Sequence, residues 1–205
     1  KHCICNGFDG HSCQEVSWVG LNAADVLGGN FTASADQYYY LTEDVDLTGS
    51  LAIARNTTLN LCLNGHTLNA PATKRAINVN GGTLNLTDCG ENGKVLSTKE
   101  KNGGVMYIQM EGTFNMYGGT LQGTEAALGG AVFINAGVMN LYDGSVVGCQ
   151  ASSGGTIFVK DNQKLNLYGG RVISGTANDT IDCIRADAGA TVTLNKPEQV
   201  DAILV

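Results

Sequence analysis

The chain has 205 residues, of which 43% are apolar and 15% are charged, so the composition excludes intrinsic disorder and predicts one large hydrophobic core. Its net charge of −7 argues against nucleic acid as a partner, because the general field of the protein would repel a polyanion. No apolar run approaches the roughly 18 residues that a membrane-spanning helix needs, so we expect no membrane insertion by this segment. Twenty-eight glycines against two prolines favour many short strands joined by tight turns.

Residues 1–37 differ from the rest of the chain and are predicted to form an N-terminal cap that contains cysteine and histidine. Cys3, Cys5, His11 and Cys13, with His2 as an alternate ligand, would suit a closed tetrahedral zinc site of the structural kind. A disulfide from Cys13 to Cys3 or Cys5 is an equally good interpretation if the compartment is oxidising. The sequence leaves both alternatives open.

A short helix is predicted within residues 16–27, where Val19, Ala23 and Val26 have helical apolar spacing. We expect Trp18 to cover the open end of the core. The terminal coil of a repeat structure exposes unpaired strand edges and needs such a cap.

Residues 38–205 contain an internal repeat that decides the fold class. One phrase, typified by Thr58-Leu-Asn-Leu, recurs at intervals of 25 to 30 residues. Its central positions are Asn60, Asn85, Asn115, Asn140, Asn166 and Thr193. A second apolar phrase runs in phase with it, at Ala76, Val105, Ala131, Thr156 and Ile181, and a third short apolar pair follows the glycine-rich turns. The repeat predicts an all-β chain, a right-handed single-stranded parallel β-helix of about six coils of about 26 residues, with three short strands per coil.

Several recurrent side chains are interpreted as structural. Identical amides stacked coil on coil form hydrogen-bonded ladders, so we assign this role to the recurrent asparagines. Tyr117, Tyr142 and Tyr168 recur in the same way and are predicted to stack beside the ladder. Cys62 and Cys89 stand near equivalent positions of successive coils and are interpreted as core thiols, with a disulfide as the alternative.

The second strand of each coil carries the candidate binding residues. Alternation leaves Tyr107, Phe133 and Phe158 pointing outward on successive coils. Two residues further along, the sequence predicts a polar row of Gln109, Asn135, Lys160 and Arg185. Exposed aromatic rings beside amides and cations are typical of a carbohydrate groove. The same rings could instead pack beneath a loop of the long coil between residues 85 and 115.

Catalytic candidates are few. Asp179, Asp182, Arg185 and Asp187 form the only cluster that resembles the acidic sites of polysaccharide lyases or glycoside hydrolases. They belong to one coil, and we align Asp182 with Ile157, Val132 and Met106 rather than with other carboxylates. The sequence therefore favours a chain without catalytic activity.

A family resemblance rests on Tyr38-Tyr-Tyr-Leu-Thr-Glu-Asp-Val-Asp-Leu, on Cys62-Leu-Asn-Gly-His and on the repeated Asn-Leu-Tyr-Gly-Gly phrases. These residues resemble the β-helix regions, of the pectin-lyase-like superfold, in large surface proteins of anaerobic gut bacteria. The resemblance covers roughly residues 38–195. It implies an extracellular or cell-surface location in a bacterium, further domains beyond the apolar residues at the end of this chain, and contact with glycans. It implies no activity, because the superfold serves enzymes, adhesins and spacers alike.

The leading hypothesis is therefore a non-catalytic β-helix domain that binds a glycan or a host surface ligand on a lateral face. The first alternative is a polysaccharide lyase or glycoside hydrolase, and the second is a structural spacer. The only cofactor expected is structural zinc.

Overall fold

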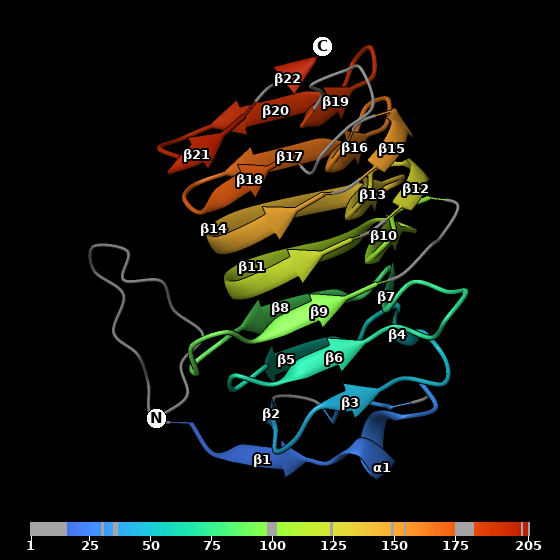
Figure 1. The fold of residues 1–205 in the computed structure, drawn as a ribbon, viewed down its shortest axis with the longest axis vertical. Helices are drawn as coiled ribbons and strands as arrows, with labels where there is room; N and C mark the ends of the chain where they lie inside the picture. The colour runs from blue at the N-terminus through green and yellow to red at the C-terminus, as the bar shows by residue number, and fades with distance from the viewer. Residues whose placement is uncertain are drawn as a thin grey trace.

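The fold is known from a computed structural model, which describes residues 16–29, 31–34, 37–97, 102–123, 125–148, 150–153, 155–174, 183–201 and 203–204. The described chain winds into stacked coils, with the first strand at one end and the last strand at the other (Figure 1). Each coil contributes strands to three faces, and every strand pairs in parallel with its counterpart in the next coil.

The first face contains the recurrent asparagines. Its strands are β1 (Trp18–Leu21), β2 (Tyr38–Leu41), β5 (Thr58–Cys62), β8 (Thr83–Thr87), β11 (Gly112–Gln122), β14 (Gly137–Val147), β17 (Lys164–Leu167) and β20 (Thr191–Leu194).

The second face follows the first corner of each coil. Its strands are β3 (Val45–Asp46), β6 (Thr67–Asn69), β9 (Lys94–Leu96), the ends of β11 and β14, β18 (Arg171–Ile173) and β21 (Gln199–Val200).

The third face carries the candidate binding residues. Its strands are β4 (Leu51–Ala54), β7 (Ile77–Asn80), β10 (Met106–Gln109), β13 (Val132–Ile134), β16 (Ile157–Val159), β19 (Ile184–Ala186) and β22 (Ile203–Leu204). A separate pair, β12 (Glu125–Leu128) and β15 (Gln150–Ser153), lies between the second and third faces in sequence. The predicted fold, a parallel β-solenoid of about six turns repeating every 26 residues or so, is confirmed.

The core is a set of apolar columns that run through the coils. On the first face one column comprises Leu59, Leu84, Phe114, Met139 and Leu165, and each of these side chains is at most 2% exposed. One coil alone could not bury such a face, but each coil covers the next, so the apolar surface leaves water only through stacking.

The corner after the first face depends on glycine. Gly170 has a φ of +67°, and a Cβ atom there would lie 2.8 Å from the carbonyl oxygen of Gly144 in the preceding coil. A side chain at this position would meet both backbone strain and a steric clash. The Gly-Gly phrases are therefore required by the corner geometry.

The N-terminal cap differs in detail from the prediction. The predicted helix is α1 (Ala23–Val26), a single turn in which Asn22 accepts a hydrogen bond from the Asp25 N–H and Asp25 accepts one from the Asn22 N–H. Trp18 lies in strand β1 and packs on the ring of Tyr38 at 5.3 Å between centroids. The prediction that Trp18 covers the core is wrong. Leu21 and Val26, which are 4% and 3% exposed, do so because they point inward from β1 and α1.

At the C-terminal end of the described residues, an apolar side chain of a core column is exposed to solvent. Leu194 stands in register with Leu167, which is fully buried, yet its own side chain is 53% exposed. No described coil covers it from above.

Candidate lateral binding face

The outer surface of the third face, which we call the lateral face, carries the predicted aromatic column. Tyr107, Phe133 and Phe158 are in parallel register on β10, β13 and β16. The ring centroids of Tyr107 and Phe133 are 5.3 Å apart, and those of Phe133 and Phe158 are also 5.3 Å apart. The predicted alignment of the three rings is therefore confirmed.

The predicted exposure of these rings is wrong for two of the three. Phe133 is 5% exposed and Phe158 is 6% exposed, whereas Tyr107 is half-buried. A Cβ atom on Gly103 would lie 3.0 Å from the Cβ of Phe133, so the turn that precedes β10 packs directly against that residue. This contact involves the backbone and Cβ of Phe133 and not its ring, so the alternative interpretation, in which part of the coil between residues 85 and 115 lies over the rings, stays a prediction. Alternation predicts the side of a strand that a residue occupies but not whether another segment covers it.

Two arginines stand at the ends of the aromatic column. The guanidinium carbon of Arg75 lies 4.6 Å from the centroid of the Tyr107 ring, and that of Arg185 lies 6.0 Å from the centroid of Phe158. Both distances suit cation–π contacts. Arg75 was not predicted, because it precedes the second-strand phrase of its coil and its counterparts in the next three coils are glycines.

Arg185 therefore belongs to the aromatic column and not to the polar row. β19 pairs Ile184 with Ile157 and Arg185 with Phe158, two residues away from the predicted alignment. The predicted match of Asp182 with Ile157 is wrong for the same reason. A shift of two residues keeps the same side chains on the inner side of the strand, so alternation alone does not decide between the two alignments.

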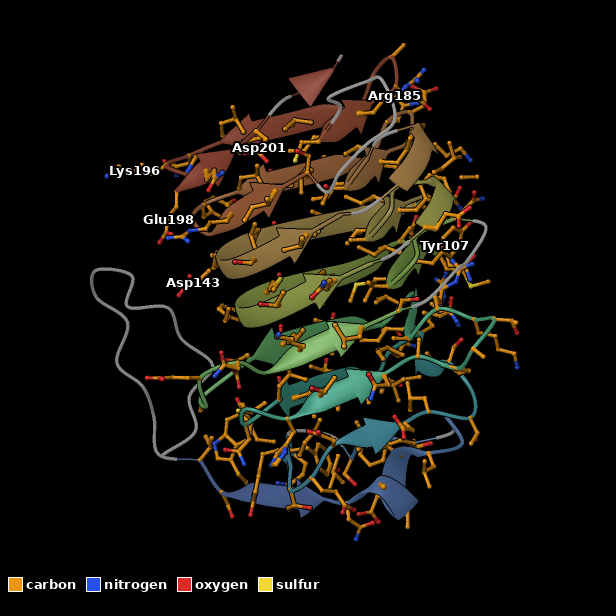
Figure 2. All side chains as sticks on the ribbon, in the orientation of Figure 1. Tyr107, Asp143, Arg185, Lys196, Glu198 and Asp201 are labelled. Atoms are coloured by element: carbon orange, nitrogen blue, oxygen red, sulfur yellow. The ribbon has the colours of Figure 1, made fainter. Side chains whose placement is uncertain are left out.

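The polar row of Gln109, Asn135 and Lys160 is present, and its members are tied to neighbouring coils. The Gln109 amide nitrogen donates to the side-chain oxygen of Asn80 at 2.8 Å, and the Lys160 ammonium donates to that of Asn135 at 2.9 Å. Asp187 follows Ala186, which pairs with Val159, so Asp187 takes the place in the row that was predicted for Arg185. Figure 2 shows Tyr107 and Arg185 on one side of the solenoid, whereas Asp143 and Glu198 lie on the other.

The catalytic candidates are only partly described. Asp179 and Asp182 lie outside the described residues, while Arg185 and Asp187 lie on and just after β19. On the described coils below Asp187, the same row holds Lys160, Asn135 and Gln109, so no carboxylate among these aligns with Asp187. Paired carboxylates of the kind that glycosidases use do not arise from this row.

The predicted zinc ligands Cys3, Cys5, His11 and Cys13, and the alternate ligand His2, also lie outside the described residues. Among the residues that the structure describes, no group of three or more histidine, cysteine, aspartate or glutamate side chains could hold a metal ion. The choice between zinc and a disulfide at the N-terminus stays a prediction.

The asparagine ladder on the first face is confirmed. Each amide nitrogen donates to the side-chain oxygen of the preceding coil, at 2.7 Å for Asn85 to Asn60, 2.8 Å for Asn115 to Asn85, 2.7 Å for Asn140 to Asn115 and 2.8 Å for Asn166 to Asn140. The first amide, Asn60, donates to the backbone oxygen of Gln37 at 3.2 Å. The ladder uses both hydrogen-bonding ends of its inner members, so these amides hold the coils together.

The tyrosine stack is also confirmed. Tyr117 and Tyr142 are 4.8 Å apart between centroids with 8° between their planes, and Tyr142 and Tyr168 are 5.0 Å apart with 9°. Because each inner ring face is covered by its neighbour, the stack presents ring edges to the surface, and sugars that stack on ring faces have no access to the inner ones.

The stack predicts a specific loss of stability at alkaline pH. Burial, and then the neighbouring tyrosine, raise the pKa of Tyr117 and of Tyr142 above the ordinary value of 10. The unfolded chain therefore loses these protons before the folded chain does, and the contribution to stability that is present below pH 10 is lost as the pH rises beyond it. In urea unfolding measured above that pH, we expect the stability advantage of the wild-type chain over Tyr142→Phe to shrink. A pH-independent difference between the two would contradict this assignment.

No protein-family model, no curated protein and no solved structure matches this chain. No helix in the described part of the chain is long and apolar enough to cross a membrane. The resemblance to surface proteins of the pectin-lyase-like superfold stays a prediction from the sequence.

Proposed function

We propose that the chain is a non-catalytic β-helix domain of a secreted or cell-surface bacterial protein, and that its lateral face binds a glycan through the polar row. The observation that carries the proposal is the repetition of Gln109, Asn135 and Lys160 at one register position on three consecutive coils. Their hydrogen bonds to neighbouring coils hold these groups at the coil spacing of about 4.8 Å. Donors and acceptors fixed at a regular interval suit the repeated hydroxyl groups of a polysaccharide.

The mode of contact differs from the stacking that exposed aromatic rings would give. Phe133 and Phe158 are buried, so their ring faces are not open to a sugar. The guanidinium group of Arg75 lies over the ring of Tyr107. Binding therefore depends on amides and on cations. Lys160, Arg75 and Arg185 form a local cationic group that attracts a glycan with carboxylate groups and offsets the general field of a chain whose net charge is −7. Such binding weakens as the salt concentration rises.

The test is affinity electrophoresis of the full chain through gels that contain polygalacturonate or a neutral β-glucan. We expect polygalacturonate to retard the wild-type chain, and Lys160→Ala to lose most of that retardation. Lys164→Ala is the matched control, because Lys164 is an exposed lysine at the start of β17 on the first face. Equal retardation of the two variants, or no retardation of the wild-type chain in either gel, would overturn the proposal.

A second candidate function, a structural spacer, is favoured by one observation. The asparagine ladder runs without interruption from Asn60 to Asn166 and braces the solenoid along its axis. A chain that no polysaccharide retards would fit this role.

A further inference from the structure

Two cysteines of adjacent coils meet at the end of the first face. Cys62 ends β5 and pairs with Thr87, the last residue of β8, and Cys89 follows two residues later. The backbone N–H of Cys89 donates to the sulfur of Cys62 at 3.2 Å. Since the N–Cα bond adds about 1.5 Å, the Cα atom of Cys89 lies within about 4.7 Å of that sulfur, a separation that a disulfide accommodates.

Hydrogen bonds on both sides fix this meeting point. The carboxylate of Asp88 accepts from the backbone N–H groups of Gly65 and Gly93, both at 2.7 Å, and thereby ties the turn after Cys62 to the turn after Cys89. The N–H of Leu63 donates to the carbonyl oxygen of Thr87 at 2.9 Å. The two cysteines are therefore held close before any covalent bond forms, so a cross-link would require little backbone movement.

The two thiols differ in access. Cys62 is fully buried, whereas Cys89 is exposed. A reagent in solution therefore reaches Cys89 first, and Cys62 meets a reagent only through Cys89.

We propose that Cys62 and Cys89 are a disulfide site that joins the coil of β5 to the coil of β8, with a small-molecule disulfide such as oxidised glutathione as the oxidant. The Cys89 thiolate attacks one sulfur of glutathione disulfide, so that a mixed disulfide forms and one glutathione leaves. The Cys62 sulfur then attacks the sulfur of Cys89, and the second glutathione leaves. Two cysteine thiols are oxidised, one external disulfide is reduced to two thiols, and the two protons pass to the departing glutathiones.

The pKa of Cys62 agrees with an order in which Cys89 reacts first and Cys62 second. The hydrogen bond to the Cys89 thiol, burial and the Cys89 charge together raise the pKa of Cys62 far above its ordinary value. Two of these three causes come from Cys89 and end when Cys89 enters the mixed disulfide. Cys62 thus becomes a better nucleophile at the step in which it has to act.

The test is a peptide map. The folded chain of 205 residues is equilibrated with excess oxidised glutathione, then denatured so that an alkylating reagent reaches every remaining thiol, and finally digested with trypsin. Cys62 falls in the tryptic peptide of residues 56–74 and Cys89 in that of residues 76–94, and each peptide contains a single cysteine. We expect the two alkylated peptides to be replaced by one cross-linked species that is two hydrogen atoms lighter than their sum and separates on reduction.

Two variants sharpen the test. In Cys89→Ala we expect Cys62 to be alkylated at least about tenfold more slowly than Cys89 is in the reduced wild-type chain, because its side chain is fully buried. Cys183→Ala is the control, since Cys183 is buried on another part of the solenoid and its thiol donates to the carbonyl oxygen of Val172; it should leave the cross-link unchanged. Full alkylation of Cys62 and Cys89 under oxidising conditions, or a cross-link from Cys89 to another cysteine, would overturn the proposal.

Discussion

Replacing Phe133 by alanine is expected to lower the free energy of unfolding by about 3–5 kcal/mol, a loss typical of a buried phenylalanine. The ring is 5% exposed and lies between the rings of Tyr107 and Phe158, so its removal leaves a cavity beneath the lateral face. Urea unfolding followed by circular dichroism measures this loss. Phe158→Ala should behave similarly, but the two losses should not add, because the rings are in contact.

Phe133→Leu is the matched control, because leucine fills most of the same volume and should cost less than about 1.5 kcal/mol. A loss below about 1 kcal/mol for Phe133→Ala would contradict the burial of the ring. In that case the ring would be available for stacking on a sugar, and the aromatic groove would replace the polar row as the candidate contact.

Replacing Asn115 by alanine is expected to lower the free energy of unfolding by about 2–3 kcal/mol, because it removes two hydrogen bonds from the centre of the ladder. Asn115 donates to Asn85 and accepts from Asn140, and both neighbours would lose a partner in a half-buried position. Denaturant unfolding of the variant measures the loss.

The end of the ladder offers an internal control. Asn166 donates to Asn140, and its loss should cost only about 1 kcal/mol. A double-mutant cycle between Asn115 and Asn140 should show a positive coupling energy of at least about 0.5 kcal/mol. Equal losses at Asn115 and Asn166, without coupling between Asn115 and Asn140, would mean that the ladder does not stabilise the solenoid.

The fold was predictable because the same residue types recur at fixed positions of each coil. The asparagines of the first face recur on five consecutive coils, and stacking them in register also stacks Leu59, Leu84 and Phe114 in the core. A register shifted by one residue would have placed these apolar side chains outside. The ladder and the tyrosine stack follow from the same register, which is why both were predicted correctly.

The lateral face was predicted less well, and the reasons are local. The predicted alignment of the strand after residues 175–182 differs from the observed one by two residues. Such a shift keeps the same side chains inward, so alternation does not distinguish the two alignments, and the predicted one places Arg185 in the polar row. The burial of Phe133 depends on what packs over the outer side of the strand, and alternation specifies only the side of the strand that a residue occupies. Asn80 could have been predicted, because the phrase that aligns Ala76 with Val105 also aligns Asn80 with Gln109 in the polar row.

Lysine footprinting of the wild-type chain tests the proposed lateral face most directly. Lys160 in the polar row and Lys164 on the first face are both exposed, and an acetylating reagent should modify both in the absence of a glycan. With polygalacturonate bound, the account predicts that acetylation of Lys160 falls while that of Lys164 is unchanged. Equal modification of Lys160 with and without the bound glycan, or protection of Lys164 instead, would contradict the account.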